Sequence, residues 1–133
     1  LETASADFVF SLEDGAQAHM ARGGTNFSGG QKQRLSIARA LCRDAEILIF
    51  DDTFSALDFK TDRQLRDALR EKTEGQTKLI VAQRIGTIMS ADRIVVLDEG
   101  RIAGIGTHRE LLSSCEVYRQ IALSQLSEEE LAI

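Results

Sequence analysis

The first segment with residues suited to chemistry is Ser28-Gly29-Gly30-Gln31, which comes just before apolar residues at helical spacing. Ser28 can cap the helix, and the two glycines let the backbone come close to a ligand. Several N–H groups and the positive end of the helix dipole would then point outward together. The sequence therefore predicts a helix start that faces a phosphate, with an ordinary capped helix start as the alternative.

Two acids follow a short apolar run. Asp51 and Asp52 come directly after the four apolar residues 47–50, a pattern that predicts a strand buried on both faces whose carboxyl end opens onto a site. The alternative is a solvated strand end. A few residues later the segment 55–58, Ser-Ala-Leu-Asp, ends in Asp58, which can cap the helix that follows.

Helices are expected on both sides of this strand. The first runs from Gln31 to Cys42, and the second covers about residues 60–73 and ends at Gly75. The residues expected on the buried faces of the two helices are Leu35, Ala38, Leu41 and Cys42 in the first, and Leu65, Ala68 and Leu69 in the second. Residues 3–13 are expected to be helical or irregular.

The rest of the chain predicts two more strands, a hairpin and further helices. Strands are expected at residues 78–81 and 94–98, and Glu99-Gly100 turns the chain back into 101–105. The spacing of Thr107 and Glu110 indicates a capping box, which makes His108 a helix-start residue, and a last helix is expected from Glu116 into the 120s. This alternation of strands and helices is typical of a parallel α/β sheet.

Composition indicates one soluble globular domain at most. The 133 residues carry a net charge of -5, with 43% apolar and 28% charged residues. Lys and Arg are scattered among acids, which argues against nucleic acid as a partner. No apolar run reaches the roughly 20 residues that cross a bilayer, so a membrane link is expected only through a partner or another part of the chain. Cys42 and Cys115 form no zinc pattern.

The three segments at 26–34, 47–52 and 55–58, in this order, strongly resemble an ATP-binding-cassette (ABC) ATPase of the multidrug and lipid exporter type. No Gly-rich phosphate loop of the form GxxxxGK[ST] occurs in the 133 residues. The resemblance therefore covers the C-terminal portion of one nucleotide-binding domain, and we expect a fragment. It implies an α/β fold, a partial P-loop NTPase (RecA-like) parallel sheet with helices, in which 1–43 is a helical-subdomain segment and 44–133 holds core sheet and C-terminal helices.

The resemblance also implies roles for single residues. Ser28, Gly29, Gly30 and Gln31 correspond to the signature motif, which in a head-to-tail dimer covers the γ-phosphate held by the opposite subunit. Asp51 corresponds to the Walker B aspartate beside Mg²⁺, and Asp58 ends the D-loop that crosses the dimer interface. The implied cofactors are ATP and Mg²⁺.

Two positions depart from the family pattern. Asp52 stands where active members have a glutamate that polarises the attacking water, and aspartate is one methylene shorter. Gln83 stands where exporters generally have a histidine at the γ-phosphate, and glutamine can carry neither charge nor a transferable proton. Together they predict a degenerate ATP site, as in one subunit of a heterodimeric exporter.

The function expected from the resemblance is solute export powered by ATP, at the cytoplasmic face of the membrane. The expected partners are a second nucleotide-binding domain and a transmembrane domain, and the chain alone is expected to be inactive. The alternative is a soluble, non-transport ABC protein that uses the cassette as an interaction module.

Overall fold

The computed structural model describes residues 1–43 and 45–131, which fall into two compact units, Leu1–Val81 and Ala82–Ile133. Each unit has its own hydrophobic core and is described by itself. The predicted subdivision of this chain into a helical-subdomain segment, 1–43, and a core segment, 44–133, stays a prediction, and its boundary residue Asp44 lies outside the described residues.

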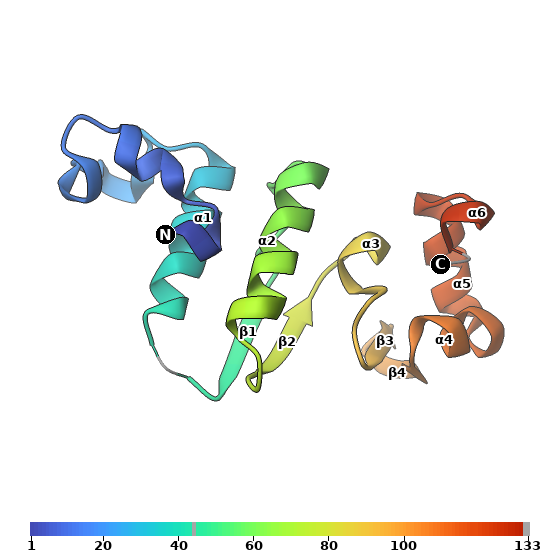
Figure 1. The fold of residues 1–133 in the computed structure, drawn as a ribbon. Coiled ribbons are helices and arrows are strands. Elements are labelled where there is room, and N and C mark those ends of the chain that lie inside the picture. Colours follow the sequence, from blue (N-terminus) through green and yellow to red (C-terminus); the bar gives the residue numbers. More distant parts are fainter. Residues whose placement is uncertain (44, 132–133) are drawn as a thin grey trace. The chain divides into compact units, whose positions relative to one another are not determined.

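The first unit is built around a strand–helix–strand motif (Figure 1). Strand β1 (Ile47–Asp51) pairs in parallel with β2 (Thr77–Val81), and helix α2 (Phe59–Lys72) connects them. Helix α1 (Gly29–Leu41) precedes β1. The segment before α1 forms four short 3₁₀ turns, η1 (Glu2–Ala4), η2 (Asp7–Ser11), η3 (Gly15–Gln17) and η4 (Arg22–Gly24). The predicted parallel strands and both helices are therefore confirmed, with their bounds shifted by one or two residues.

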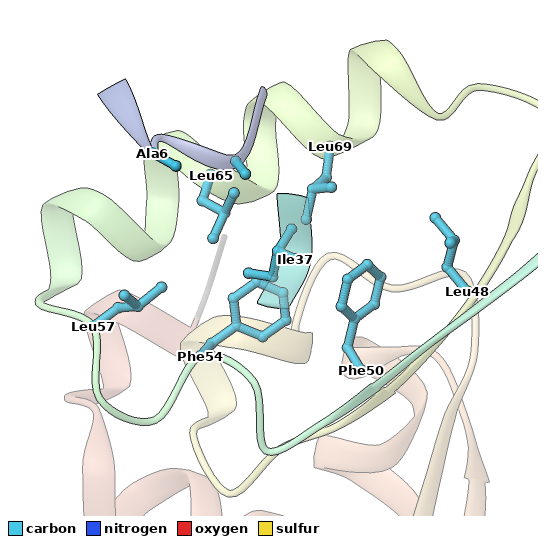
Figure 2. Close-up of a cluster of buried hydrophobic side chains, with 9 residues drawn as sticks. Ala6, Ile37, Leu48, Phe50, Phe54, Leu57, Leu65 and Leu69 are labelled. Atoms are coloured by element: carbon cyan, nitrogen blue, oxygen red, sulfur yellow. The ribbon is translucent and has the colours of Figure 1, made fainter. Parts of the chain in front are cut away.

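The core of the first unit lies on one side of this small sheet. Figure 2 shows side chains from α1, α2, β1 and the loop after β1 gathered in one cluster. The rings of Phe50 and Phe54 pack at 5.6 Å between centroids. The buried members of the cluster are Ala4, Ala6, Ile37, Leu48, Phe50, Phe54, Leu57, Leu65 and Leu69.

One burial prediction for this unit is wrong and a second is right only in part. β1 alternates between buried and exposed residues, with Ile47 61% and Ile49 67% exposed, because the described core covers only one face of the pair β1–β2. On α1 the prediction is right for Ala38 and Leu41, which pack against the core, and wrong for Cys42, which is exposed. The fully buried residue of the helix is Ile37. Ile37 is the buried member of the cluster that α1 supplies, and Cys42 lies past the last helical residue.

The second unit is a hairpin covered by helices. Strand β3 (Ile94–Asp98) pairs antiparallel with β4 (Arg101–Gly106), as predicted, through a turn in which Glu99 and Gly100 have φ of 45° and 76°. The helices are α3 (Ile85–Ile88), α4 (His108–Ser114), α5 (Glu116–Gln125) and α6 (Glu128–Leu131). Their shared core contains Ile85, Ile94, Val96, Leu111, Cys115, Tyr118, Ala122 and Leu131.

His108 begins α4, as the Thr107–Glu110 capping box predicts, and it is also part of the core. Only 4% of His108 is exposed, with Nδ1 2.8 Å from the Tyr118 hydroxyl and Nε2 3.2 Å from the Leu131 carbonyl. Burial raises the pKa of Tyr118. This histidine ties three helices of the second unit together.

Candidate functional site

The start of α1 has the cap that its sequence predicts. The Ser28 hydroxyl accepts a hydrogen bond from the Gln31 amide at 3.2 Å, and the Gln31 side-chain oxygen accepts one from the Ser28 amide at 2.8 Å. This reciprocal pair is a capping box that fixes the backbone of the turn. The amides of Gly29 and Gly30 precede the first bonds inside the helix, so they are free of the helical ladder and suited to an anion.

The two glycines also allow a close approach between chain segments. A Cβ on Gly30 would lie 3.2 Å from the carbonyl oxygen of Ala56 and 3.4 Å from a methyl of Leu57. A Cβ on Gly29 would lie 3.4 Å from the Cβ of Ala56. The first turn of α1 therefore lies directly against the segment 55–58, and the lack of a side chain at Gly30 serves this contact.

Gln33 joins the same two segments and is the residue that sequence reasoning missed. Its side-chain oxygen accepts a hydrogen bond from the Ala56 amide at 3.1 Å, and its side-chain nitrogen donates to the Ser55 hydroxyl at 3.2 Å and to the Asp52 carbonyl at 3.4 Å. One amide thus connects α1 to the loop that follows the paired acids. The only signal in the sequence is a polar residue one turn into the helix, which by itself is ordinary.

The two acids lie at the exposed carboxyl end of β1, as predicted. Asp51 is the last residue of the strand and pairs with Val81. Asp52 has a φ of 49°, a left-handed conformation that aspartate and asparagine adopt more readily than most other residues with a side chain. Its amide donates to the Val81 carbonyl at 3.0 Å, and its carbonyl accepts from the Ser55 hydroxyl at 2.9 Å. The backbone that carries the Asp52 carboxylate is therefore held from two sides.

Asp58 is the N-cap of α2. Its carboxylate accepts hydrogen bonds from the Thr61 amide at 2.9 Å and from the Thr61 hydroxyl at 2.7 Å. These bonds, the backbone one first, lower the pKa of Asp58 below its ordinary value of 3.8. The capping alternative raised from the sequence is thus confirmed for Asp58.

Gln83 follows β2 and belongs to the second unit. The residue is exposed, and its backbone carbonyl accepts a hydrogen bond at 2.8 Å from the side chain of Gln125. Of the predicted site residues, the first unit therefore contains Ser28 to Gln31, Asp51, Asp52 and Asp58. Gln83 lies in the second unit.

The loop before α1 is fastened by side chains. Asn26 receives a hydrogen bond from the Ala21 amide and donates one to the His19 carbonyl. The guanidinium of Arg34 donates to the carbonyls of Gly30 and Ser5 and lies 5.0 Å from the centroid of the Phe8 ring. The N-terminal turns are thereby attached to the start of α1.

Carboxylates are suitable ligands for a divalent cation at this strand end. Among residues 1–43 and 45–131, no group of three or more His, Cys, Asp or Glu side chains is placed to hold a metal. Mg²⁺ that arrives with a nucleotide is usually bound by one or two carboxylates together with phosphate oxygens. Asp51 offers a donor of this kind.

The described residues, 1–43 and 45–131, include no helix that combines the length and the apolar character of a membrane span.

Comparison with known proteins gives consistent matches. A family model described as ABC transporter matches residues 3–55. An uncharacterised ABC transporter ATP-binding protein of Mycobacterium bovis is 48% identical over 94% of this chain and 21% of its own length. An ATP-dependent lipid A-core flippase of Hahella chejuensis is 46% identical over 91% of this chain and 21% of its own.

A solved structure agrees with these matches. A bacterial Atm1-family ABC exporter with ATP bound superposes with a TM-score of 0.86 at 37% identity, covering 90% of this chain and 21% of that one. The chain thus spans about a fifth of the length of the relatives it matches. The α/β fold with part of a P-loop domain, predicted from the sequence, is confirmed.

Proposed function

We propose that this chain, as part of an ABC transporter ATP-binding domain of the exporter type, helps to couple ATP binding and hydrolysis to the export of a solute across a membrane. Similarity to an ATP-dependent flippase and to an ATP-bound exporter supports the proposal. The observation that carries it is the contact of Gly29 and Gly30 with the segment 55–58, next to the paired acids after β1. Gln33 connects the helix start, which would bind an anion, to the loop after the strand end, which would bind a cation.

The chain would act within a larger assembly. A second nucleotide-binding domain would pair with it head to tail and bring its own ATP to the turn at Ser28, Gly29, Gly30 and Gln31. A transmembrane domain would hold the assembly at the cytoplasmic face of the membrane. Asp58, besides capping α2, would lie near the dimer interface.

Mg²⁺ would be held beside ATP by Asp51, and it would neutralise charge on the phosphates when bound. Asp52 would face the attacking water from a backbone held by Val81 and Ser55. Its carboxylate is one methylene shorter than that of a glutamate, and loss of a well-placed general base lowers rates by about 10²–10⁴. Gln83 would offer a hydrogen bond to the γ-phosphate but no positive charge. We therefore infer a degenerate ATP site, in a pair whose other subunit hydrolyses ATP.

The test compares the two sites of the complete transporter. Asp52→Asn keeps the side-chain shape and tolerates the left-handed backbone, so a change in rate reports on the carboxylate alone. We expect a change in steady-state ATPase of less than about twofold, whereas removing the partner subunit's general base should lower it by about 10² or more.

A gain-of-function variant provides the second part of this test. Asp52→Glu combined with Gln83→His should raise single-turnover hydrolysis at this site, a measurement that slow product release does not mask. If Asp52→Asn alone stops hydrolysis at both sites, Asp52 is the working base and the degenerate-site proposal is wrong.

A further inference from the structure

A single side chain from the last turn of α5 holds the backbone around Gln83. The side-chain oxygen of Gln125 accepts a hydrogen bond from the Ile85 amide at 2.9 Å. Its side-chain nitrogen donates to the Gln83 carbonyl at 2.8 Å. We call this pair of hydrogen bonds the amide clasp. It spans 40 and 42 residues of sequence, so it is a tertiary contact and not part of the local fold.

The amide clasp provides hydrogen-bond partners for two backbone groups that have none within a helix or a strand ladder. Ile85 is the first residue of α3, and its N–H has no acceptor inside the helix. The N-cap residue Arg84 makes no side-chain capping bond to α3. Gln83 lies between β2 and α3, outside the β1–β2 ladder. Because an N–H can only donate and a carbonyl can only accept, the two partners fix which end of the Gln125 amide faces each of them.

Ile85 and helix α5, which the amide clasp joins, pack in the same hydrophobic core. Ile85 is 2% exposed, and Tyr118 and Ala122 of α5 are 2% and 0% exposed in the same cluster. Gln125 follows Ala122 by less than one helical turn, so its backbone is fixed by that packing. The carbonyl of the exposed Gln83 is therefore hydrogen-bonded to a helix that packs in the core of the second unit.

We propose that Gln125 is a positioning residue, which holds the backbone of Gln83 so that the Gln83 side chain can meet the γ-phosphate of ATP. This inference rests on the function proposed above for Gln83. It adds a role for the C-terminal helix α5, whose placement then affects nucleotide binding through one amide. A side chain that lacks either a donor or an acceptor could not take this role.

Amide exchange in the complete transporter tests the amide clasp itself. Gln125→Met keeps the length of the side chain and removes both hydrogen bonds. The matched control is Gln120→Met on the same helix, which removes only a hydrogen bond from Gln120 to Glu116. We expect hydrogen–deuterium exchange at the Ile85 amide to become about two- to tenfold faster in Gln125→Met. The Gln120→Met control should leave it unchanged. Unchanged exchange at Ile85 in Gln125→Met would overturn the clasp.

A double-mutant cycle then tests whether Gln125 acts through Gln83. The readout is the dissociation constant of a fluorescent trinitrophenyl-ATP at this site, with Mg²⁺ present. Gln125→Met should weaken binding about two- to tenfold when Gln83 is present and should have no effect in a Gln83→Ala background. Additive effects of the two changes would overturn the positioning role.

The two proposals fail differently in these experiments. If Gln83→Ala alone leaves nucleotide affinity and single-turnover rate unchanged, the function proposed for Gln83 is wrong, and the positioning role falls with it. If Gln83→Ala matters and Gln125→Met does not, only the role of Gln125 is wrong. A purely structural Gln125 would shift the unfolding midpoint of the transporter without any dependence on Gln83.

Discussion

Gly29 and Gly30 differ in what surrounds their α-carbons, and this difference allows a substitution that changes charge with little change in packing. Gly30 faces a backbone carbonyl at 3.2 Å from the position of a Cβ, so any side chain there pushes on the segment 55–58. Gly29 is exposed and would bring its Cβ only to 3.4 Å from the methyl of Ala56. Position 29 is therefore the better place to probe the anion that the turn is proposed to meet.

We predict that Gly29→Asp in the complete transporter lowers ATPase activity by about a hundredfold or more, because its carboxylate would repel the partner-held γ-phosphate. An acid in the first turn stabilises a helix, so misfolding of α1 does not explain such a loss. The isosteric control Gly29→Asn carries no charge and should lose far less activity. Steady-state ATPase of the two assembled variants decides the matter, and equal activities would contradict the assigned role of this turn.

At the scale of elements, the caps determine where the helices begin, and the cap of α2 is the titratable side chain of Asp58. The hydrogen bonds from Thr61 favour the charged form of Asp58 in the folded chain and so lower its pKa. The stabilisation this provides is present at pH values above the unfolded-state pKa and is lost as the pH falls through the lower, folded-state pKa. The charged Asp58 carboxylate should therefore stabilise the N-terminus of α2 less at acidic pH.

Asp58→Asn keeps an acceptor for the Thr61 amide but cannot titrate. We predict that the variant is less stable than the parent chain at pH 6 and that the difference in their free energies of unfolding, the stability gap, becomes smaller at pH 3. Urea unfolding of both proteins followed by far-UV circular dichroism measures this gap. Glu110 and Glu130, whose pKa values are also lowered by capping bonds, titrate in both proteins and cancel in the comparison. A gap that is independent of pH would show that the Asp58 charge contributes nothing.

At the scale of the whole molecule, both sheets leave apolar side chains exposed. In the first unit these are Ile47 and Ile49 of β1, with Leu79 and Val81 of β2. In the second unit they are Val95, Leu97, Ile102 and Ile105 of the hairpin. Contiguous exposed apolar residues of this kind favour association.

We predict that the 133-residue chain by itself neither binds Mg-ATP tightly nor hydrolyses it, because no Gly-rich phosphate loop occurs in its sequence and its signature turn would serve a partner's nucleotide. Isothermal titration calorimetry with Mg-ATP measures this directly. A micromolar dissociation constant would contradict the prediction. Sedimentation velocity on the same sample should show association that increases with concentration.

The amino-acid sequence determined the features of this protein that depend on near neighbours. The cap at Ser28, the capping box at Thr107, the strand that ends at Asp51 and the turn at Gly100 are all predicted correctly, because each involves residues only a few positions apart. The motif order in the sequence also predicted the α/β fold that the comparisons confirm.

Only the tertiary structure decided which side chains connect these elements. Gln33 meets Ala56 across 23 residues and Gln125 meets Gln83 across 42, and neither glutamine differs in sequence from an ordinary solvated one. The exposed face of β1 and the burial of His108 against Tyr118 likewise depend on what packs beside them. A side chain's partners follow from the position of its backbone in the fold, and hydrophobic periodicity specifies a face of an element but not the residue it will meet.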